Sequence, residues 1–209
     1  MFRAFYQEHA PITHVAAFFA TFSVIALSTT AAQAGHHEDM QHDMTPTVEV
    51  SAMKSTTAPL VNVEGEEAGM VTMMEGTKGV VFKIEGTGFA EGWHGAHLHQ
   101  VGDCSDNEAG FKASGSHVKA DESSKHGYQN PEGPEAGDLP NVFVHHSTLN
   151  AEFYSGMVSY DMNVEGRAKL LDEDGFALVL HENPDDMVSQ PIGGAGSRIA
   201  CAAFKSVSE

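Results

Sequence analysis

The chain has 209 residues, with 29 acidic and 11 basic side chains and a formal net charge of −18 at pH 7. This length bounds it to one or two domains. Because no cluster of lysine or arginine interrupts the negative charge, the sequence excludes nucleic acid and anionic membrane surfaces as partners.

Residues 1–34 have the features of a cleaved export signal. A short start containing Arg3 precedes an apolar run from Val15 to Leu27, and Ala32-Gln33-Ala34 fits the small-x-small pattern of a signal-peptidase site. The apolar run is shorter than the ~20 residues that a membrane-spanning helix needs. We therefore predict cleavage after Ala34, a periplasmic mature protein and no stable membrane insertion. The alternatives are a membrane anchor and a buried helix.

Residues 35–46 (GHHEDMQHDMTP) are polar and show no apolar periodicity, which predicts a disordered arm rich in His and Met. Imidazole and thioether side chains suit copper, so the arm either captures copper or is a solvated tail. The rest of the chain, 47–209, is predicted to form one domain.

The predicted domain is all-β. Short segments rich in Val, Ile, Phe and Thr alternate with glycine-containing turns, which is typical of antiparallel strands in a sandwich or barrel. The clearest of these segments are Thr47–Ser51, Gly69–Met74, Gly79–Glu85, Ala96–Val101, Phe176–Leu180 and Arg198–Phe204.

Two long stretches between these strands, Gly102–Leu139 and Glu182–Ser197, are rich in Gly, Pro, Ser and Asp. Loops of this length in a compact domain are usually functional or disordered. Both stretches follow segments that carry histidines, and this placement favours function.

His97 and His99 lie two residues apart in a predicted strand, so their side chains project from the same face. Two imidazoles on one face of a strand make half of a metal site, although the H-x-H pattern alone is a weak signal. His181 ends another predicted strand, where a hydrogen-bonded strand-end histidine is the alternative.

The first long stretch contains further candidate ligands, His117, His126 and Asp138. Each is unremarkable alone, but together they offer imidazole and carboxylate ligands suited to copper and zinc. Cys104 and Cys201 are the two cysteines of the chain. In an exported protein they predict one disulfide, and two free thiols are the alternative.

Several motifs occur in the order expected of copper–zinc superoxide dismutases, and together they cover about residues 61–204. The chain resembles this family through HGAHLHQVGDC, GSH, KHG, NPEGP, GDLPN, LLDEDGFALVLHENPDD and GGAGSRIAC. The resemblance implies a flattened, eight-stranded Greek-key β-barrel, related in architecture to the immunoglobulin sandwich.

The resemblance also implies roles for individual residues. The copper ligands would be His97, His99, His117 and His181. His117 would bridge copper to zinc, and the other zinc ligands would include His126 and Asp138. Asp185 would be the carboxylate that links ligand histidines of the two sites. Arg198 would attract superoxide beside the copper, and Cys104 and Cys201 would form the disulfide.

One position departs from the family pattern. A third zinc histidine is expected three residues before Asp138, and this chain has Glu135 there. Glutamate ligates zinc through oxygen, so we expect zinc to be bound, with reduced positive charge and more weakly or with altered geometry. The alternative is that Glu135 points to solvent and leaves the zinc site incomplete.

The resemblance implies dismutation of superoxide to dioxygen and hydrogen peroxide, with copper and zinc as cofactors and His117 and Arg198 as the catalytic residues. The alternative function is copper binding or delivery on the same fold with little turnover. The sequence leaves open whether the protein is a monomer or a homodimer.

Overall fold

The computed structural model describes residues 53–206, which form an all-β domain. The chain divides into two units, Met1–Thr47 and Val48–Glu209, and every described residue belongs to the second. The predicted export signal, the His/Met-rich arm and the predicted strand Thr47–Ser51 lie outside the described residues. Helical structure in the described part is limited to two 3-10 turns, η1 (Asn107–Ala109) and η2 (Lys112–Ser114).

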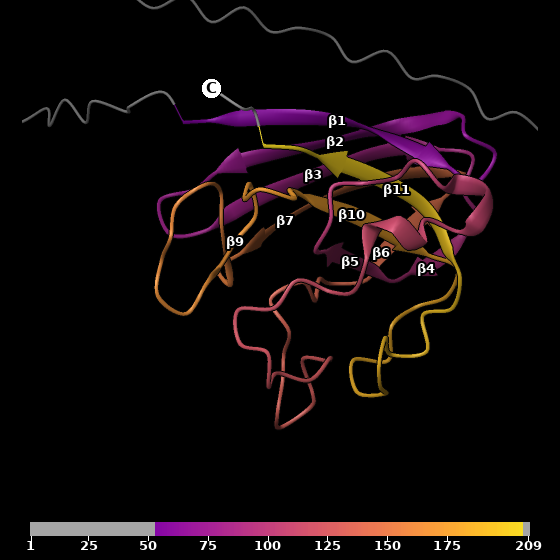
Figure 1. Cartoon of the computed structure of the whole chain (residues 1–209). Helices are drawn as coiled ribbons and strands as arrows, with labels where there is room; N and C mark the ends of the chain where they lie inside the picture. The colour runs from indigo at the N-terminus through magenta and orange to yellow at the C-terminus, as the bar shows by residue number, and fades with distance from the viewer. Residues whose placement is uncertain (1–52, 207–209) are drawn as a thin grey trace, which may run out of the picture. The chain divides into compact units, whose positions relative to one another are not determined.

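Nine strands form one sheet in the order β4-β6-β7-β3-β2-β1-β11-β10-β5 (Figure 1). They are β1 (Ser55–Asn62), β2 (Glu67–Glu75), β3 (Val80–Thr87), β4 (Gly92–His94), β5 (Ala96–His99), β6 (Val142–His145), β7 (Thr148–Ser155), β10 (Phe176–His181) and β11 (Arg198–Phe204). A separate parallel pair consists of β8 (Val158–Ser159) and β9 (Ala168–Lys169).

The sheet is a nearly closed barrel because β4 and β5, its two end strands, are consecutive in the chain. Gly95 alone separates them, so they act as two halves of one bent strand, and the barrel has eight strands in effect. All neighbouring strands in the sheet are antiparallel, and β3 pairs with β7 rather than with β4. The predicted all-β Greek-key fold is confirmed.

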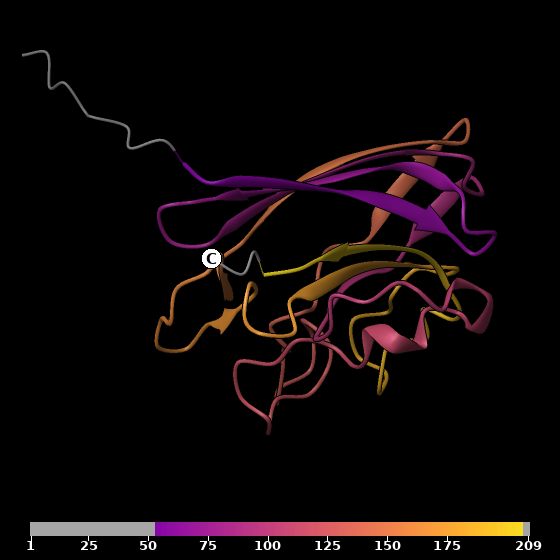
Figure 2. The same cartoon turned by 45° about the horizontal axis from the view of Figure 1, so that its top comes forward.

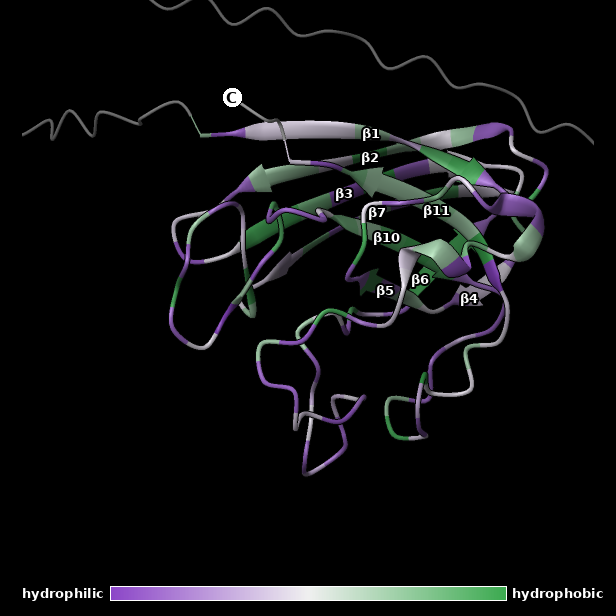
Figure 3. Cartoon of the chain, in the orientation of Figure 1, coloured by the Kyte–Doolittle hydropathy of each residue, from purple (hydrophilic) through white to green (hydrophobic). Residues whose placement is uncertain are grey.

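The barrel core follows the two-residue periodicity of the strands. In β3, Val80, Phe82 and Ile84 are fully buried, whereas Val81 and Lys83 between them are partly exposed. Figure 2 shows β1, β2 and β3 in one layer above β10 and β11, and the core lies between these layers. Figure 3 shows that hydrophobic residues gather on the strands, whereas the long loops are mostly hydrophilic.

β5 and β10 are buried on both faces, unlike β3. Their inward residues, such as Leu98 and Leu178, belong to the barrel core. On the opposite face, Ala177 and Val179 pack with Phe111 of the first long loop. The long loops therefore cover the outer face of this part of the barrel, and a second buried space forms outside the core.

Two loops make this cover, residues 100–141 between β5 and β6 and residues 182–197 between β10 and β11. They project on the same side of the barrel (Figure 1). The disulfide between Cys104 and Cys201 ties the first loop to β11 across a sequence separation of 97 residues. In the chain-entropy model, a crosslink over such a loop stabilises the fold by about 4–5 kcal/mol.

Candidate metal centre

Three histidines meet on the outer face of the β5–β10 pair. His97 pairs with Val179 and His99 with Ala177, so both imidazoles project from the face that carries these two residues. His181 ends β10 with the same parity as Ala177 and Val179. The three side chains are buried, and they offer ligand atoms within 4.8 Å of one another. The H-x-H pattern thus places its two histidines beside the strand-end histidine.

The first long loop brings two further ligand candidates to the edge of β5. His117 forms an isolated antiparallel bridge with His99, and Asp138 forms one with His97. Gly137 makes this approach possible, because a Cβ atom there would lie 2.4 Å from the carbonyl oxygen of Leu98. The glycine of the GDLPN motif therefore lets the loop run alongside the strand.

Each of three histidines uses one ring nitrogen on a protein acceptor. His97 Nε2 donates to Asp185 Oδ2 at 2.8 Å, His99 Nδ1 to the carbonyl of Gly115 at 2.9 Å, and His181 Nδ1 to the carbonyl of Gly196 at 3.1 Å. Because these acceptors cannot donate, the facing nitrogen carries the proton and the other nitrogen of a neutral imidazole keeps its lone pair.

Among residues 53–206, four buried ring nitrogens have no hydrogen-bond partner: His97 Nδ1, His99 Nε2, His117 Nε2 and His181 Nε2. Their rings follow one another in a closed circuit, with centroids 4.1 Å apart for 97–117, 5.2 Å for 117–99, 6.0 Å for 99–181 and 4.8 Å for 181–97. Buried polar atoms are rarely left unpaired without a ligand. A site with four imidazole nitrogens fits copper.

A second group of ligand atoms surrounds the other nitrogen of His117. His117 Nδ1 lies 2.9 Å from Glu135 Oε2 and 3.4 Å from Asp138 Oδ1, and His126 Nδ1 lies 2.7 Å from Asp138 Oδ1. Tetrahedral zinc with ligands at about 2.0–2.1 Å sets neighbouring ligand atoms about 3.3 Å apart. Two imidazoles and two carboxylates at these separations fit zinc.

Glu135 is buried, with 6% of its surface exposed, so its side chain does not point to solvent. A different set of four residues, His97, His117, His126 and Asp138, also offers ligand atoms within 4.8 Å of one another, and in this set His97 stands in place of Glu135. We assign His97 instead to the first group, the four histidines with an unpaired ring nitrogen. Its Nε2 is hydrogen-bonded to Asp185, and its unpaired Nδ1 is one of those four nitrogens.

Asp185 connects the two groups. Its Oδ2 accepts from His97 Nε2 at 2.8 Å and its Oδ1 from His126 Nε2 at 3.1 Å. Asn141 fixes the backbone of Asp185 through two reciprocal hydrogen bonds of 2.8 Å. Gly193, at φ +60°, is required here, because a Cβ would lie 1.7 Å from Asp185 Oδ1. The second long loop therefore orients one histidine of each group.

Arg198 begins β11 and lines a cleft of about 490 Å³ together with His99, His117, Lys119 and Glu135. Its guanidinium donates to the carbonyls of Phe111 at 2.6 Å and Gly115 at 2.8 Å. Since the Gly115 carbonyl also accepts from His99 Nδ1, one backbone oxygen holds both the arginine and a histidine of the first group. The arrangement presents a fixed positive charge beside that group.

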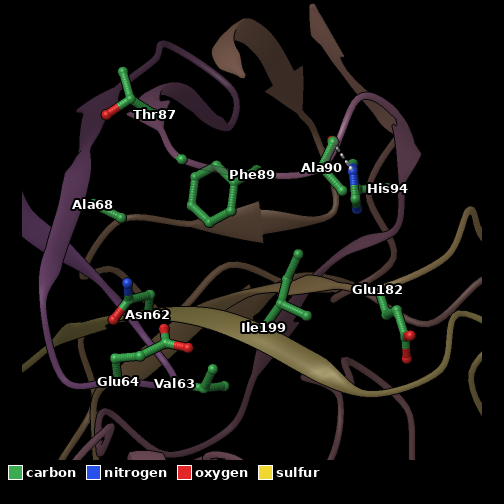
Figure 4. A pocket seen from close by; sticks show the side chains of 11 residues that line it. Asn62, Val63, Glu64, Ala68, Thr87, Phe89, Ala90, His94, Glu182 and Ile199 are labelled. Carbon is green, nitrogen blue, oxygen red and sulfur yellow. Dashed lines mark hydrogen bonds between the residues drawn. The ribbon is translucent and has the colours of Figure 1, made fainter. Parts of the chain in front are cut away.

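A second hollow, of about 220 Å³, lies at one end of the barrel, with Phe89 and Ile199 facing each other across it (Figure 4). His94 is on its wall, and its ring nitrogens lie 2.8 Å from the His181 carbonyl and 2.9 Å from the Ala90 carbonyl. None of the predicted ligand side chains lines this hollow. His94 is thus a structural contact behind His181.

The family model for copper/zinc superoxide dismutase matches residues 67–204. The chain belongs to the copper/zinc superoxide dismutase family. It is 45% identical over 152 residues to a Cu-Zn superoxide dismutase from Caulobacter vibrioides, covering 72% of this chain and 86% of the relative. It is 35% identical over 150 residues to Cu-Zn superoxide dismutase 2 of Aquifex aeolicus, covering 71% and 85%.

Solved structures of the family give the same result. A superoxide dismutase-like protein from Bacillus subtilis matches with a TM-score of 0.66 at 30% identity, over 73% of this chain and 99% of that one. The Cu/Zn superoxide dismutase of Brucella abortus matches with a TM-score of 0.56 at 25% identity, over 72% and 99%.

Several residues that support these ligand positions have no signal that sequence reasoning could use. Tyr128 donates to the Asp138 carbonyl at 2.6 Å, and Gln190 donates to the His126 carbonyl at 2.8 Å. Lys119 Nζ lies 2.9 Å from Glu135 Oε1. Asn141, which fixes Asp185, differs from these three residues in that it stands inside the GDLPN motif.

The pKa values of His97, His99 and His181 shift in the opposite direction to that of His126 in the metal-free protein. Burial and the neighbouring His97 lower the pKa of His181 to about 3, and burial also holds the pKa values of His97 and His99 below their ordinary range. Burial lowers the pKa of His126 too, but hydrogen bonds to Asp138 and Asp185 outweigh it and raise the pKa to about 10.

These shifts predict that the stability of the metal-free protein falls on both sides of near-neutral pH. His126 keeps its proton in the folded state up to about pH 10, whereas an unfolded histidine loses it near pH 6.5, so this contribution is lost as pH rises between these values. His181 stays neutral down to about pH 3, so stability falls as pH drops below about 6.5.

Urea midpoints of the metal-free protein between pH 5 and 10 test this prediction. We expect the alkaline decline to be much reduced in His126→Gln and retained in His145→Gln, which changes an exposed histidine of β6. An equal alkaline decline in all three proteins would contradict the role given to His126.

Proposed function

We propose that this chain disproportionates superoxide to dioxygen and hydrogen peroxide, consuming two superoxide ions and two protons in each full cycle. Membership of the copper/zinc superoxide dismutase family supports this activity. The single observation that carries it is the set of four buried, partnerless imidazole nitrogens beside a fixed arginine.

Copper would be held by His97 Nδ1 and by the Nε2 atoms of His99, His117 and His181. Zinc would be held by the remaining group, which is His117 Nδ1, His126 Nδ1, Asp138 Oδ1 and Glu135 Oε2. When bound, copper supplies one-electron redox chemistry and zinc supplies a fixed positive charge.

His117 is the residue that both groups share. Its Nδ1 faces Glu135 and Asp138, and its Nε2 is one of the four unpaired nitrogens of the proposed copper site. Held on one side by the carboxylates, the ring can accept a proton at Nε2 and return it toward a substrate in the cleft that it lines. We therefore assign proton transfer to this atom.

Arg198 would draw the anionic substrate into the cleft. The chain carries a net charge of −18, so the overall field opposes an approaching anion and a local charge must dominate near the site. Screening over about 8 Å removes most of the effect of distant carboxylates. Lys119 lies in the same cleft, but its ammonium is paired with Glu135, which leaves the guidance mainly to Arg198.

We also propose export to the periplasm, with residues 1–34 as the signal and 35–46 as the arm of the mature protein. The apolar run from Val15 to Leu27 and the pattern Ala32-Gln33-Ala34 support it. The Cys104–Cys201 disulfide is a bond that persists in oxidising compartments. Within residues 53–206 there is no helix long and apolar enough to span a bilayer.

Metal content and superoxide consumption measured on one sample test the proposed function. After reconstitution with equimolar Cu²⁺ and Zn²⁺, we expect one ion of each per chain and catalytic loss of superoxide. His181→Ala should lose copper and activity together, because it removes one of the four copper ligands, whereas the exposed-site control His145→Gln should keep both.

Copper binding without turnover would overturn the proposal and favour the alternative of copper delivery. Copper without zinc would refute the assignment of Glu135 and its neighbours as zinc ligands while leaving the copper site intact.

Arg198→Glu should retain copper and slow turnover at low ionic strength by at least about tenfold, because local charges of this kind change association rates by 10–10³. The matched control is Arg167→Glu, which makes the same charge change in the turn before β9. Stopped-flow superoxide decay, with copper content measured in parallel, checks the effect. Equal rates in the two variants would show that net charge, and not Arg198, sets the rate.

A further inference from the structure

The two oxygens of Glu135 have different partners. Oε2 lies 2.9 Å from His117 Nδ1, inside the proposed zinc group, and Oε1 lies 2.9 Å from Lys119 Nζ. The glutamate side chain is 8% exposed and the lysine side chain 26% exposed. A buried carboxylate is thus shared between a ligand position and a cation.

The loop backbone explains why Lys119 reaches this position. His117 bridges to His99, and the Val118 amide donates to the Leu98 carbonyl at 2.8 Å, so the segment runs along the edge of β5. In an extended segment, residues two apart share a face, which puts Lys119 on the side of His117. Lys119 Nζ also donates to the Ser124 carbonyl at 3.1 Å, and this second contact fixes the ammonium.

The charges around Glu135 balance. Replacing a neutral histidine with glutamate adds one negative charge to the ligand group, and Lys119 adds one positive charge within contact distance of it. The negative charge that Glu135 adds to the ligand group is therefore offset by Lys119, which is not itself a ligand.

We propose that Lys119 is a positioning residue for Glu135: it holds Oε1, directs Oε2 alone to zinc, and restores the net charge that a third histidine would give. The proposal rests on the zinc assignment made above. Lys119 and Glu135 together then take the place of one histidine, and the zinc site keeps four single-atom ligands.

Without Lys119, Oε1 loses its partner close to the metal position. A carboxylate whose second oxygen is free is able to bind through both oxygens, and zinc-type ions accept a fifth ligand atom. The ligand geometry therefore reports on Lys119 separately from activity. Cobalt is a suitable probe, because the intensity of its visible absorption distinguishes four-coordinate from five-coordinate sites.

The test uses one equivalent of Co²⁺ in protein whose copper position is filled with colourless Cu⁺. We expect an intense four-coordinate spectrum in the parent and a clearly weaker one in Lys119→Met. Glu135→His and the double variant Lys119→Met/Glu135→His should both keep the intense spectrum, because the effect of Lys119 requires the carboxylate. Lys83→Met is the matched control, since it breaks the exposed 2.8 Å ion pair with Glu85 on β3.

Urea unfolding of the metal-free proteins gives a second readout. Lys119→Met should lower the midpoint in the Glu135 protein, because a buried carboxylate loses its cation, and should lower it less in the Glu135→His protein.

An unchanged cobalt spectrum in Lys119→Met, or an equal change in both backgrounds, would overturn the proposal. Equal midpoint shifts in both backgrounds would overturn it as well. Failure of the parent to bind cobalt would instead overturn the zinc assignment on which it rests.

Discussion

Four imidazole lone pairs that point into a buried space without a partner are the constraint on which the site depends. His97, His99 and His181 each commit one nitrogen to a carboxylate or a carbonyl, and this fixes which nitrogen remains available. An unsatisfied buried polar atom costs roughly 1–3 kcal/mol. The metal-free fold therefore carries an unfavourable term that a bound ion removes, so that metal binding and folding stability are coupled.

Both the barrel and its loops contribute residues to this arrangement. The outer face of β5 and β10 supplies three histidines in fixed register, and the loops supply the rest together with the cover that excludes water. Asp185 orients His97 and His126 at once, so a shift of the second loop moves one histidine of each group. The Gly115 carbonyl joins His99 to Arg198 in a similar way, which ties the position of the attracting charge to the copper group.

The sequence predicted the fold and the ligand residues of the site more fully than the contacts that support those ligands. Short segments rich in Val, Ile, Phe and Thr located β2, β3, β10 and β11, and the expected second loop, Glu182–Ser197, matches the interval between β10 and β11. Period-two geometry placed His97 and His99 on one face, but pattern alone left His117, His126 and Asp138 as separate loop residues, and the family motifs joined them. Lys119, Tyr128 and Gln190 were not found, because a lysine, a phenol or an amide in a loop acquires its role only from long-range folding.

X-ray absorption at the copper edge of the Cu²⁺- and Zn²⁺-loaded protein tests the central claim most directly, because it counts the ligands around the ion. The four unpaired nitrogens predict a copper shell of imidazole nitrogens, with outer-shell scattering from four rings, and the loss of one ring in His99→Ala. A copper ion with two or fewer imidazoles, or with sulfur ligands from the methionines of residues 35–46, would contradict the account.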